Sequence, residues 1–128
     1  MRPTNSLART KGLLLEPNEL AHAIVGAAAD KKATDIVLLD LRQIALIADY
    51  FVICSGQSVR QLRAIVKDVI KAIKDLGQYP RFVEGTPESG WVLIDFGTVV
   101  VHVFSPELRS YYALEQLWRE APVVVRMQ

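Results

Sequence analysis

Cysteine, histidine and carboxylate side chains are the residues of this sequence best suited to catalysis. Cys54, His102 and Asp95 are of the types that form a thiol nucleophile, its general base and an orienting acid. Cys54, however, ends an apolar run typical of a buried strand, so we expect an inert thiol. We interpret His102 as a structural histidine hydrogen-bonded to Asp95. His22 and His102 show no metal-ligand spacing, and the sequence predicts no metal site.

The stretch CSGQSVRQL, residues 54–62, raises a second question, because a glycine turn before a helix can bind phosphate. The stretch lacks the lysine and the spacing of a Walker loop and contains no G-x-G-x-x-G. Its glycine and serine resemble a junction of the nucleotidyltransferase fold, whose enzymes hold two metal ions with paired carboxylates. About ten residues after Ser58, where those enzymes have the carboxylate pair, this chain has Asp68 alone. We therefore expect a turn with Ser58 as helix N-cap, and no catalytic residues or cofactor.

The composition of the chain narrows the classes of function open to it. With 128 residues, 51% of them hydrophobic, one domain with a substantial core is expected. The net charge of +1 argues against a broad nucleic-acid-binding surface and leaves room for a small local basic patch. No apolar run is long enough to span a membrane, and the single cysteine suits a reducing compartment.

The first fifteen residues, MRPTNSLARTKGLLL, differ from the rest because they contain Arg2, Arg9 and Lys11 but no acid. An organelle transit peptide has this bias. The segment is short and contains Pro3, so we expect residues 1–15 to form a flexible N-terminal tail rather than a transit peptide. We accordingly expect the protein to be cytoplasmic.

Hydrophobic periodicity predicts a single α/β domain over residues 16–122, with a mixed, mostly five-stranded sheet flanked by helices. The expected elements are a helix at 17–31, strands at 35–41 and 49–56, a long helix from Ser58 to Gly77, a strand at 81–85, a hairpin at 91–104 and a helix from Ser105 to about Glu120. The first two strands are too close for a helical crossover and should be antiparallel. Residues 123–128 form a C-terminal tail that could dock as a short edge strand or stay loose.

The hairpin WVLIDFGTVVVHVF determines which side chains share a face of the sheet. A two-residue loop with glycine first sets the register, with Asp95 opposite Val100, Leu93 opposite His102 and Trp91 opposite Phe104. One face is then wholly apolar and belongs to the core: Val92, Ile94, Phe96, Val99, Val101 and Val103. Trp91, Asp95 and His102 share the opposite face.

Side chains outside this core, on the opposite face of the sheet and on the last helix, indicate a protein-binding surface. To the face of Trp91 the terminal helix adds aromatic and charged residues, namely Arg109, Tyr111, Tyr112, Glu115 and Trp118. Aromatic rings and arginine are enriched in protein interfaces because they bury much area at modest entropic cost. The alternative is that these side chains merely pack the helix on the sheet.

Five stretches occur in a distinctive order within residues 17–121: DIVLLDLR, ADYFVICSGQSVRQLRAI, VEG, WVLIDFGTVVVHVF and RSYYALEQLW. Together they resemble the segments that define the ribosomal silencing factor family, the Iojap-like proteins. The resemblance implies a nucleotidyltransferase-like fold without catalytic carboxylates, and a protein that is not an enzyme. It also implies a homodimer that binds the fourteenth protein of the large ribosomal subunit, blocks joining of the small subunit and represses translation when nutrients are scarce.

By the same resemblance, Trp91 and Tyr112 are expected to contact that ribosomal protein. Four further residues are expected to build or brace the surface: Asp95, His102, Arg109 and Glu115. Little direct nucleic-acid contact is expected, and no membrane contact. Two alternatives stay open, a factor that remains on large-subunit precursors during assembly and an active nucleotidyltransferase with unusual metal ligands.

Overall fold

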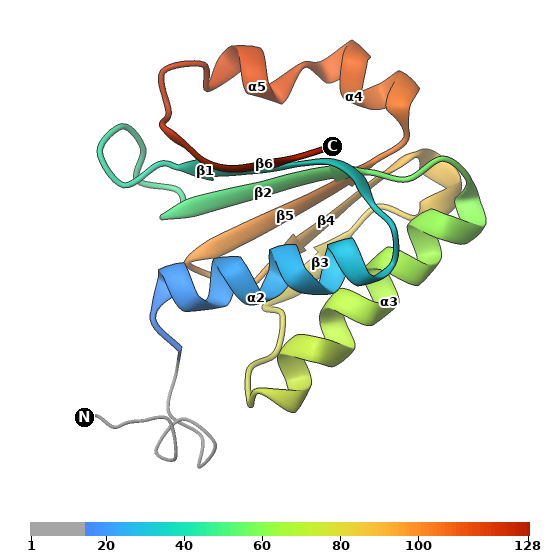
Figure 1. Cartoon of the computed structure of the whole chain (residues 1–128), viewed down its shortest axis with the longest axis horizontal. Helices are drawn as coiled ribbons and strands as arrows, with labels where there is room; N and C mark the ends of the chain where they lie inside the picture. Colours follow the sequence, from blue (N-terminus) through green and yellow to red (C-terminus); the bar gives the residue numbers. More distant parts are fainter. Residues whose placement is uncertain (1–14) are drawn as a thin grey trace.

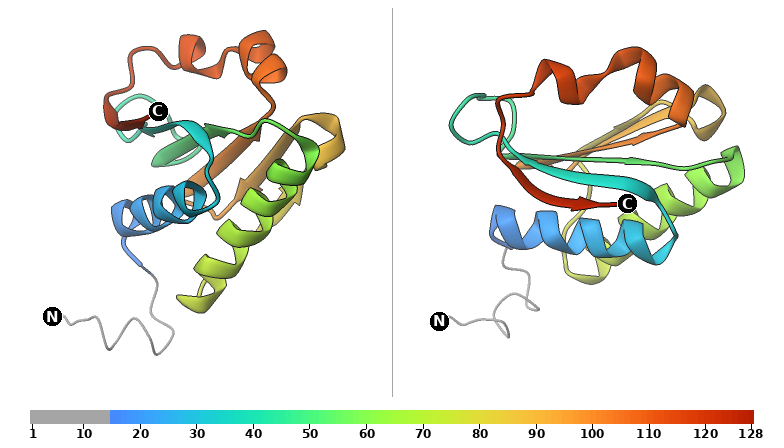
Figure 2. Two further views of the ribbon diagram at one scale, coloured as in Figure 1. Left: turned by 45° about the vertical axis from the view of Figure 1, so that its right-hand side comes forward. Right: turned by 45° about the horizontal axis from the view of Figure 1, so that its top comes forward.

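A six-stranded sheet with helices on both faces forms the domain, in a computed structural model that describes residues 15–128. Helices α2 (Pro17–Asp30) and α3 (Val59–Asp75) lie side by side on one face, and α4 (Pro106–Tyr112) and α5 (Leu114–Leu117) cross the other (Figures 1 and 2). The predicted single α/β domain with a mixed sheet is confirmed. The predicted N-terminal tail lies, except for its last residue, outside the described residues. None of the helices within the described residues is long and apolar enough to cross a membrane.

Three largely buried strands, β5, β2 and β1, form the centre of the sheet, whose six strands have the order β3-β4-β5-β2-β1-β6. Its two edge strands are β3 (Phe82–Glu84) and β6 (Val123–Met127). β1 (Thr34–Asp40) and β2 (Tyr50–Ser55) are antiparallel, as their short connection predicted. β2 then runs parallel to β5 (Val99–Phe104), and α3 supplies the long connection that a parallel pair requires. Apolar runs form these strands because both faces of the central sheet are covered.

The hairpin of β4 (Trp91–Asp95) and β5 has the predicted register. Phe96 N donates to Val99 O at 2.9 Å, which closes a two-residue loop, and Gly97 adopts the positive φ of +94° that this loop needs. The side chains predicted for the apolar face all lie in the core beneath α2 and α3. A second core, which includes Phe51 and Phe104, lies between the sheet and the α4–α5 layer.

The stretch CSGQSVRQL folds as a strand end, a turn and a capped helix. Ser58 Oγ accepts a hydrogen bond from Gln61 N at 3.1 Å, and Gln61 Oε1 accepts one from Gln57 N at 2.6 Å. One N–H group of the first helical turn, that of Gln61, and the N–H of Gln57 just before the cap are therefore already bound. Gly56 is tightly enclosed, since an added Cβ would lie 2.9 Å from Leu62 Cδ2. The helix-cap interpretation is confirmed, and α3 ends before Gly77 as predicted.

The C-terminal third differs from the prediction in two respects. The single long helix that was expected is broken at Ala113, whose φ of +49° is left-handed, so α4 and α5 are separate. Residues that could have stayed loose form β6 (Val123–Met127), which pairs antiparallel with β1. The sheet therefore has six strands rather than five, because the apolar C-terminal run covers an edge of β1 that would otherwise stay unpaired. At the other edge, β3 (Phe82–Glu84) pairs with β4.

Candidate functional site

An aromatic surface forms where β4, β5 and α4 meet. The ring of Trp91 contacts Phe104 of β5 at a centroid distance of 4.9 Å and Tyr112 of α4 at 4.6 Å. Tyr112 is 47% exposed and Trp91 is partly exposed, so neither ring is fully buried in the core. Tyr111, 78% exposed, contacts Tyr112 edge-on at 5.0 Å. We call Trp91, Tyr111 and Tyr112 the aromatic surface.

His102 supports this surface from below. Trp91 Nε1 donates a hydrogen bond to His102 Nδ1 at 3.3 Å, so the proton of the neutral imidazole resides on Nε2. Nε2 is buried without a conventional partner among the described residues, and the ring lies edge-on to Phe51 at 4.7 Å. Burial lowers the pKa of His102 to about 4, which keeps the ring neutral at physiological pH. His102 is 4% exposed and therefore orients Trp91 rather than meeting solvent.

Asp95 does not bond to His102, and that part of the prediction is wrong. Asp95 Oδ1 instead accepts a hydrogen bond from Gly97 N at 2.6 Å. This N–H lies two residues away at the hairpin loop, where an aspartate side chain commonly satisfies the backbone of its own turn. Asp95 thus holds the loop of the β4–β5 hairpin, while the acceptor site of His102 is taken by Trp91.

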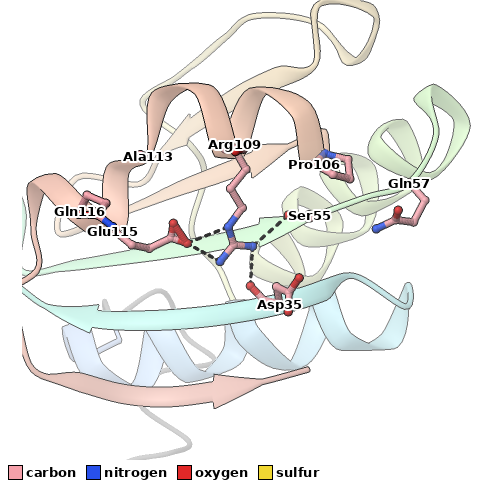
Figure 3. Close-up of a pocket in the computed structure, with 9 residues that line it drawn as sticks. Asp35, Ser55, Gln57, Pro106, Arg109, Ala113, Glu115 and Gln116 are labelled. Carbon is pink, nitrogen blue, oxygen red and sulfur yellow. Dashed lines mark hydrogen bonds and ion pairs between the residues drawn. The ribbon is translucent and has the colours of Figure 1, made fainter.

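Arg109 of α4 joins four elements through its guanidinium group (Figure 3). Its Nη1 donates to Ser55 Oγ at 2.9 Å and to the carbonyl oxygen of Asp35 at 2.6 Å. Its Nε and Nη2 lie 2.8 and 2.7 Å from Glu115 Oε2 on α5. The Arg109 side chain is 12% exposed and that of Glu115 31%, so water screens this pair only in part. Arg109 therefore fastens α4 to the sheet.

The ion pair of Arg109 and Glu115 spans the helix break at Ala113. Residues six apart on one continuous helix do not face each other, but the left-handed residue turns Glu115 back toward Arg109. The break also ends α4 directly after Tyr112. These side chains consequently brace the segment that presents Tyr112. A hollow of about 680 Å³ adjoins them, lined mostly by polar side chains (Figure 3).

The sequence prediction missed two apolar side chains that extend the aromatic surface toward the sheet edge. Phe82 of β3, 44% exposed, pairs with Asp95, and Leu93 of β4 is partly exposed. A small hollow of about 160 Å³ is lined by Trp91, Leu93, Glu84 and Gly85. Strand alternation could have found Leu93, because it lies between Trp91 and Asp95 on the same face.

The nucleophile set is not assembled by the fold. Cys54 pairs with Val103 and His102 with Ile53 in the parallel ladder, so Cys54 and His102 point to opposite faces of the sheet. Cys54 is fully buried beneath α2 and α3, and burial raises the pKa of its thiol to about 12. A thiol in this state is a poor nucleophile. Within residues 15–128 no three His, Cys, Asp or Glu side chains gather as a metal site would require.

Comparison with known proteins places these features in context. Residues 15–128 match the family model described as "Ribosomal silencing factor during starvation". A protein named ribosomal silencing factor RsfS from Halalkalibacterium halodurans is 46% identical over 83% of this chain and 91% of its own length. A mouse protein named mitochondrial assembly of ribosomal large subunit protein 1 is 36% identical over 74% of this chain and 43% of its own length. A crystal structure of a Chromobacterium violaceum protein, 35% identical, covers 81% of this chain and 87% of that protein with a TM-score of 0.78.

Proposed function

The chain belongs to the ribosomal silencing factor family, and on that premise we propose that it binds the large ribosomal subunit and prevents the small subunit from joining. The partner is the fourteenth protein of the large subunit, and the result is repression of translation when nutrients are scarce. The domain acts by occupying space, and no bond is made or broken. The protein works in the cytoplasm as a homodimer.

The observation that carries this proposal is the ring pair of Trp91 and Tyr112. Their centroids lie 4.6 Å apart, and both rings remain accessible at the surface. Aromatic side chains in such clusters dominate the energetics of protein interfaces, especially when their geometry is set before binding. Both rings are held in place by the surrounding structure, Trp91 by the hydrogen bond to His102 and Tyr112 by the short helix that Arg109 anchors.

The four bracing residues act behind this surface. His102 is buried, Asp95 binds its own turn, and Arg109 and Glu115 bond mainly to each other and to the sheet. The contribution of His102, Arg109 and Glu115 to binding is therefore indirect, through the orientation of the two rings, and that of Asp95 is indirect through the hairpin loop. Since the contact is made by rings, we expect it to weaken less steeply with salt than a contact made to phosphates.

The decisive experiment uses the purified fourteenth protein and purified large subunits. Tyr112→Ala and Trp91→Leu should each reduce affinity for the isolated protein at least tenfold, as loss of a central aromatic anchor does. The same variants should fail to inhibit joining of the two subunits. Tyr79→Ala provides the matched control, because Tyr79 is an exposed aromatic residue, 66% accessible, outside the aromatic surface. If folded Tyr112 and Trp91 variants bind as tightly as the control, the site assignment is wrong.

A second candidate function is assembly of the large subunit, which the name of the mouse relative favours. The same aromatic surface would then hold the protein on a precursor particle. The two functions differ in the particle that carries the protein. Sedimentation of cell extracts should place a silencing factor on mature large subunits, and an assembly factor on immature ones.

A further inference from the structure

Helix α3 presents a narrow row of basic side chains to solvent. The row consists of Arg60, Arg63, Lys67, Lys71 and Lys74, all exposed. At about 100° per residue these five positions fall within about 80° around the helix, and at 1.5 Å per residue they extend over about 21 Å. The buried residues of α3, among them Leu62 and Val69, occupy the opposite side. We call the five side chains the basic stripe.

The charge of the molecule is unevenly distributed because of this stripe. Helix α3 contains five basic residues and two acidic ones, Asp68 and Asp75, a net charge of +3. The whole chain carries +1, so everything outside α3 sums to −2. Within the stripe Arg63 pairs with Glu88 and Lys71 with Asp75. The other three cations have no carboxylate partner among the described residues.

A nucleic acid suits this stripe better than a protein does. Protein interfaces have an apolar centre depleted of lysine, whereas interfaces with nucleic acids are more polar and much more positive. The middle of the stripe offers no exposed apolar side chain, since Val59 and Leu76, the exposed apolar residues of this region, lie at the two ends of α3. The three cations without a carboxylate partner within residues 15–128, Arg60, Lys67 and Lys74, follow one another about every 10.5 Å along α3, so each can reach a different phosphate of one backbone.

We propose that the basic stripe of α3 binds the phosphate backbone of structured RNA. Helix α3 lies on the face of the sheet opposite α4, as Figure 2 shows, so docking through the aromatic surface leaves the basic stripe accessible. The protein then has two independent surfaces, one for a protein and one for RNA. Low overall charge is compatible with this activity because the attraction is local.

The test measures binding of the full chain to a fluorescently labelled RNA duplex of about 16 base pairs over a range of salt. Three unpaired cations predict a slope of log affinity against log salt of about −2.7, or about a 40-fold loss between 50 and 200 mM salt. Lys67→Gln combined with Lys74→Gln should lower that slope to about −0.9 and weaken binding at 50 mM salt more than tenfold. Glutamine keeps the helix propensity of lysine, so this double variant should fold.

The control removes two charges elsewhere, by combining Arg119→Gln with Arg126→Gln, both on exposed positions outside α3. It should bind the duplex within about twofold of the wild type. Equal losses in the two double variants would overturn the proposal, as would absence of RNA binding at low salt. Binding to poly-glutamate but not to RNA would assign the stripe to an acidic protein and would also overturn it. Tyr112→Ala should bind RNA normally, so this test and that of the aromatic surface fail separately.

Discussion

Replacement of Arg109 by methionine tests whether the guanidinium group fastens the α4–α5 segment to the sheet. The substitution removes the hydrogen bonds to Ser55 Oγ and to the carbonyl oxygen of Asp35, together with the ion pair to Glu115. Methionine keeps a long, flexible apolar stem and so limits the loss of packing. The change therefore isolates the polar interactions of one side chain.

The expected magnitude follows from the burial of each partner. Ser55 is 2% exposed, and a hydrogen bond of this kind contributes about 1 kcal/mol. The bond to the Asp35 carbonyl adds about the same, and the partly screened pair with Glu115 adds less than about 1 kcal/mol. We expect the free energy of unfolding to fall by about 2–3 kcal/mol, which lowers the Tm by roughly 6–10 °C for a chain of this size.

Thermal unfolding followed by circular dichroism measures this change, and Arg42→Met is the matched control. Arg42 also pairs with a carboxylate, that of Asp40, but its side chain is 55% exposed. Exposed pairs contribute little, so the control should unfold close to the wild-type temperature. If Arg109→Met and Arg42→Met unfold at the same temperature, the polar contacts of Arg109 do not stabilise the packing of α4 on the sheet as proposed.

Three further predictions concern stability and reactivity. Burial lowers the pKa of His102 to about 4 from 6.5, so the imidazole of the unfolded chain binds a proton first as the pH falls. The free energy of unfolding should therefore drop by about 3 kcal/mol from pH 6.5 to pH 4. Urea midpoints that do not change between these pH values would contradict this prediction. Gly85→Ala would place a Cβ 2.1 Å from Trp91 O at a φ of +85° and should destabilise the fold by more than about 2 kcal/mol. The Cβ of Gly26→Ala meets nothing within 4 Å, and this variant should stabilise the fold by about 0.5–1 kcal/mol. If Gly85→Ala unfolds at a higher temperature than Gly26→Ala, the argument is refuted. Cys54, with its pKa raised to about 12 by burial, should react with iodoacetamide only as fast as the protein unfolds, and rapid alkylation of the folded chain would show that the thiol is accessible.

Local patterns in the sequence were sufficient for most of the fold. The apolar runs of β1 and β2, the loop at Gly97 and the Ser58 cap each depend on interactions within a few residues or on simple alternation. These interactions are encoded by short stretches, so the register of the hairpin and the two faces of β4 could be predicted. The sequence placed Trp91 and Tyr112 on one surface but did not predict that their rings touch. In the structure the two ring centroids lie 4.6 Å apart.

The error at the last helix arose where distant segments decide the outcome. The stretch ELRSYYALEQLW has helical periodicity throughout, yet Ala113 adopts a left-handed conformation that the sequence does not signal. The ion pair of Arg109 and Glu115 and the bonds of Arg109 to two strands offset the strain at this position. The error at Asp95 had a local cause: Asp95 was assigned to His102 because both lie on one face, but its carboxylate instead accepts the N–H of Gly97, two residues away.

Periodicity and turn chemistry are local properties of the chain, and they were enough to predict the types of most elements, the pairing of the hairpin and the burial of Cys54. Three relations became visible only in the folded domain: Cys54 and His102 face opposite ways across the sheet, Arg109 reaches both Ser55 and Glu115, and α3 with its basic stripe lies on the face of the sheet opposite α4. These relations join residues far apart in the chain, and their distances depend on how the layers pack rather than on any short stretch.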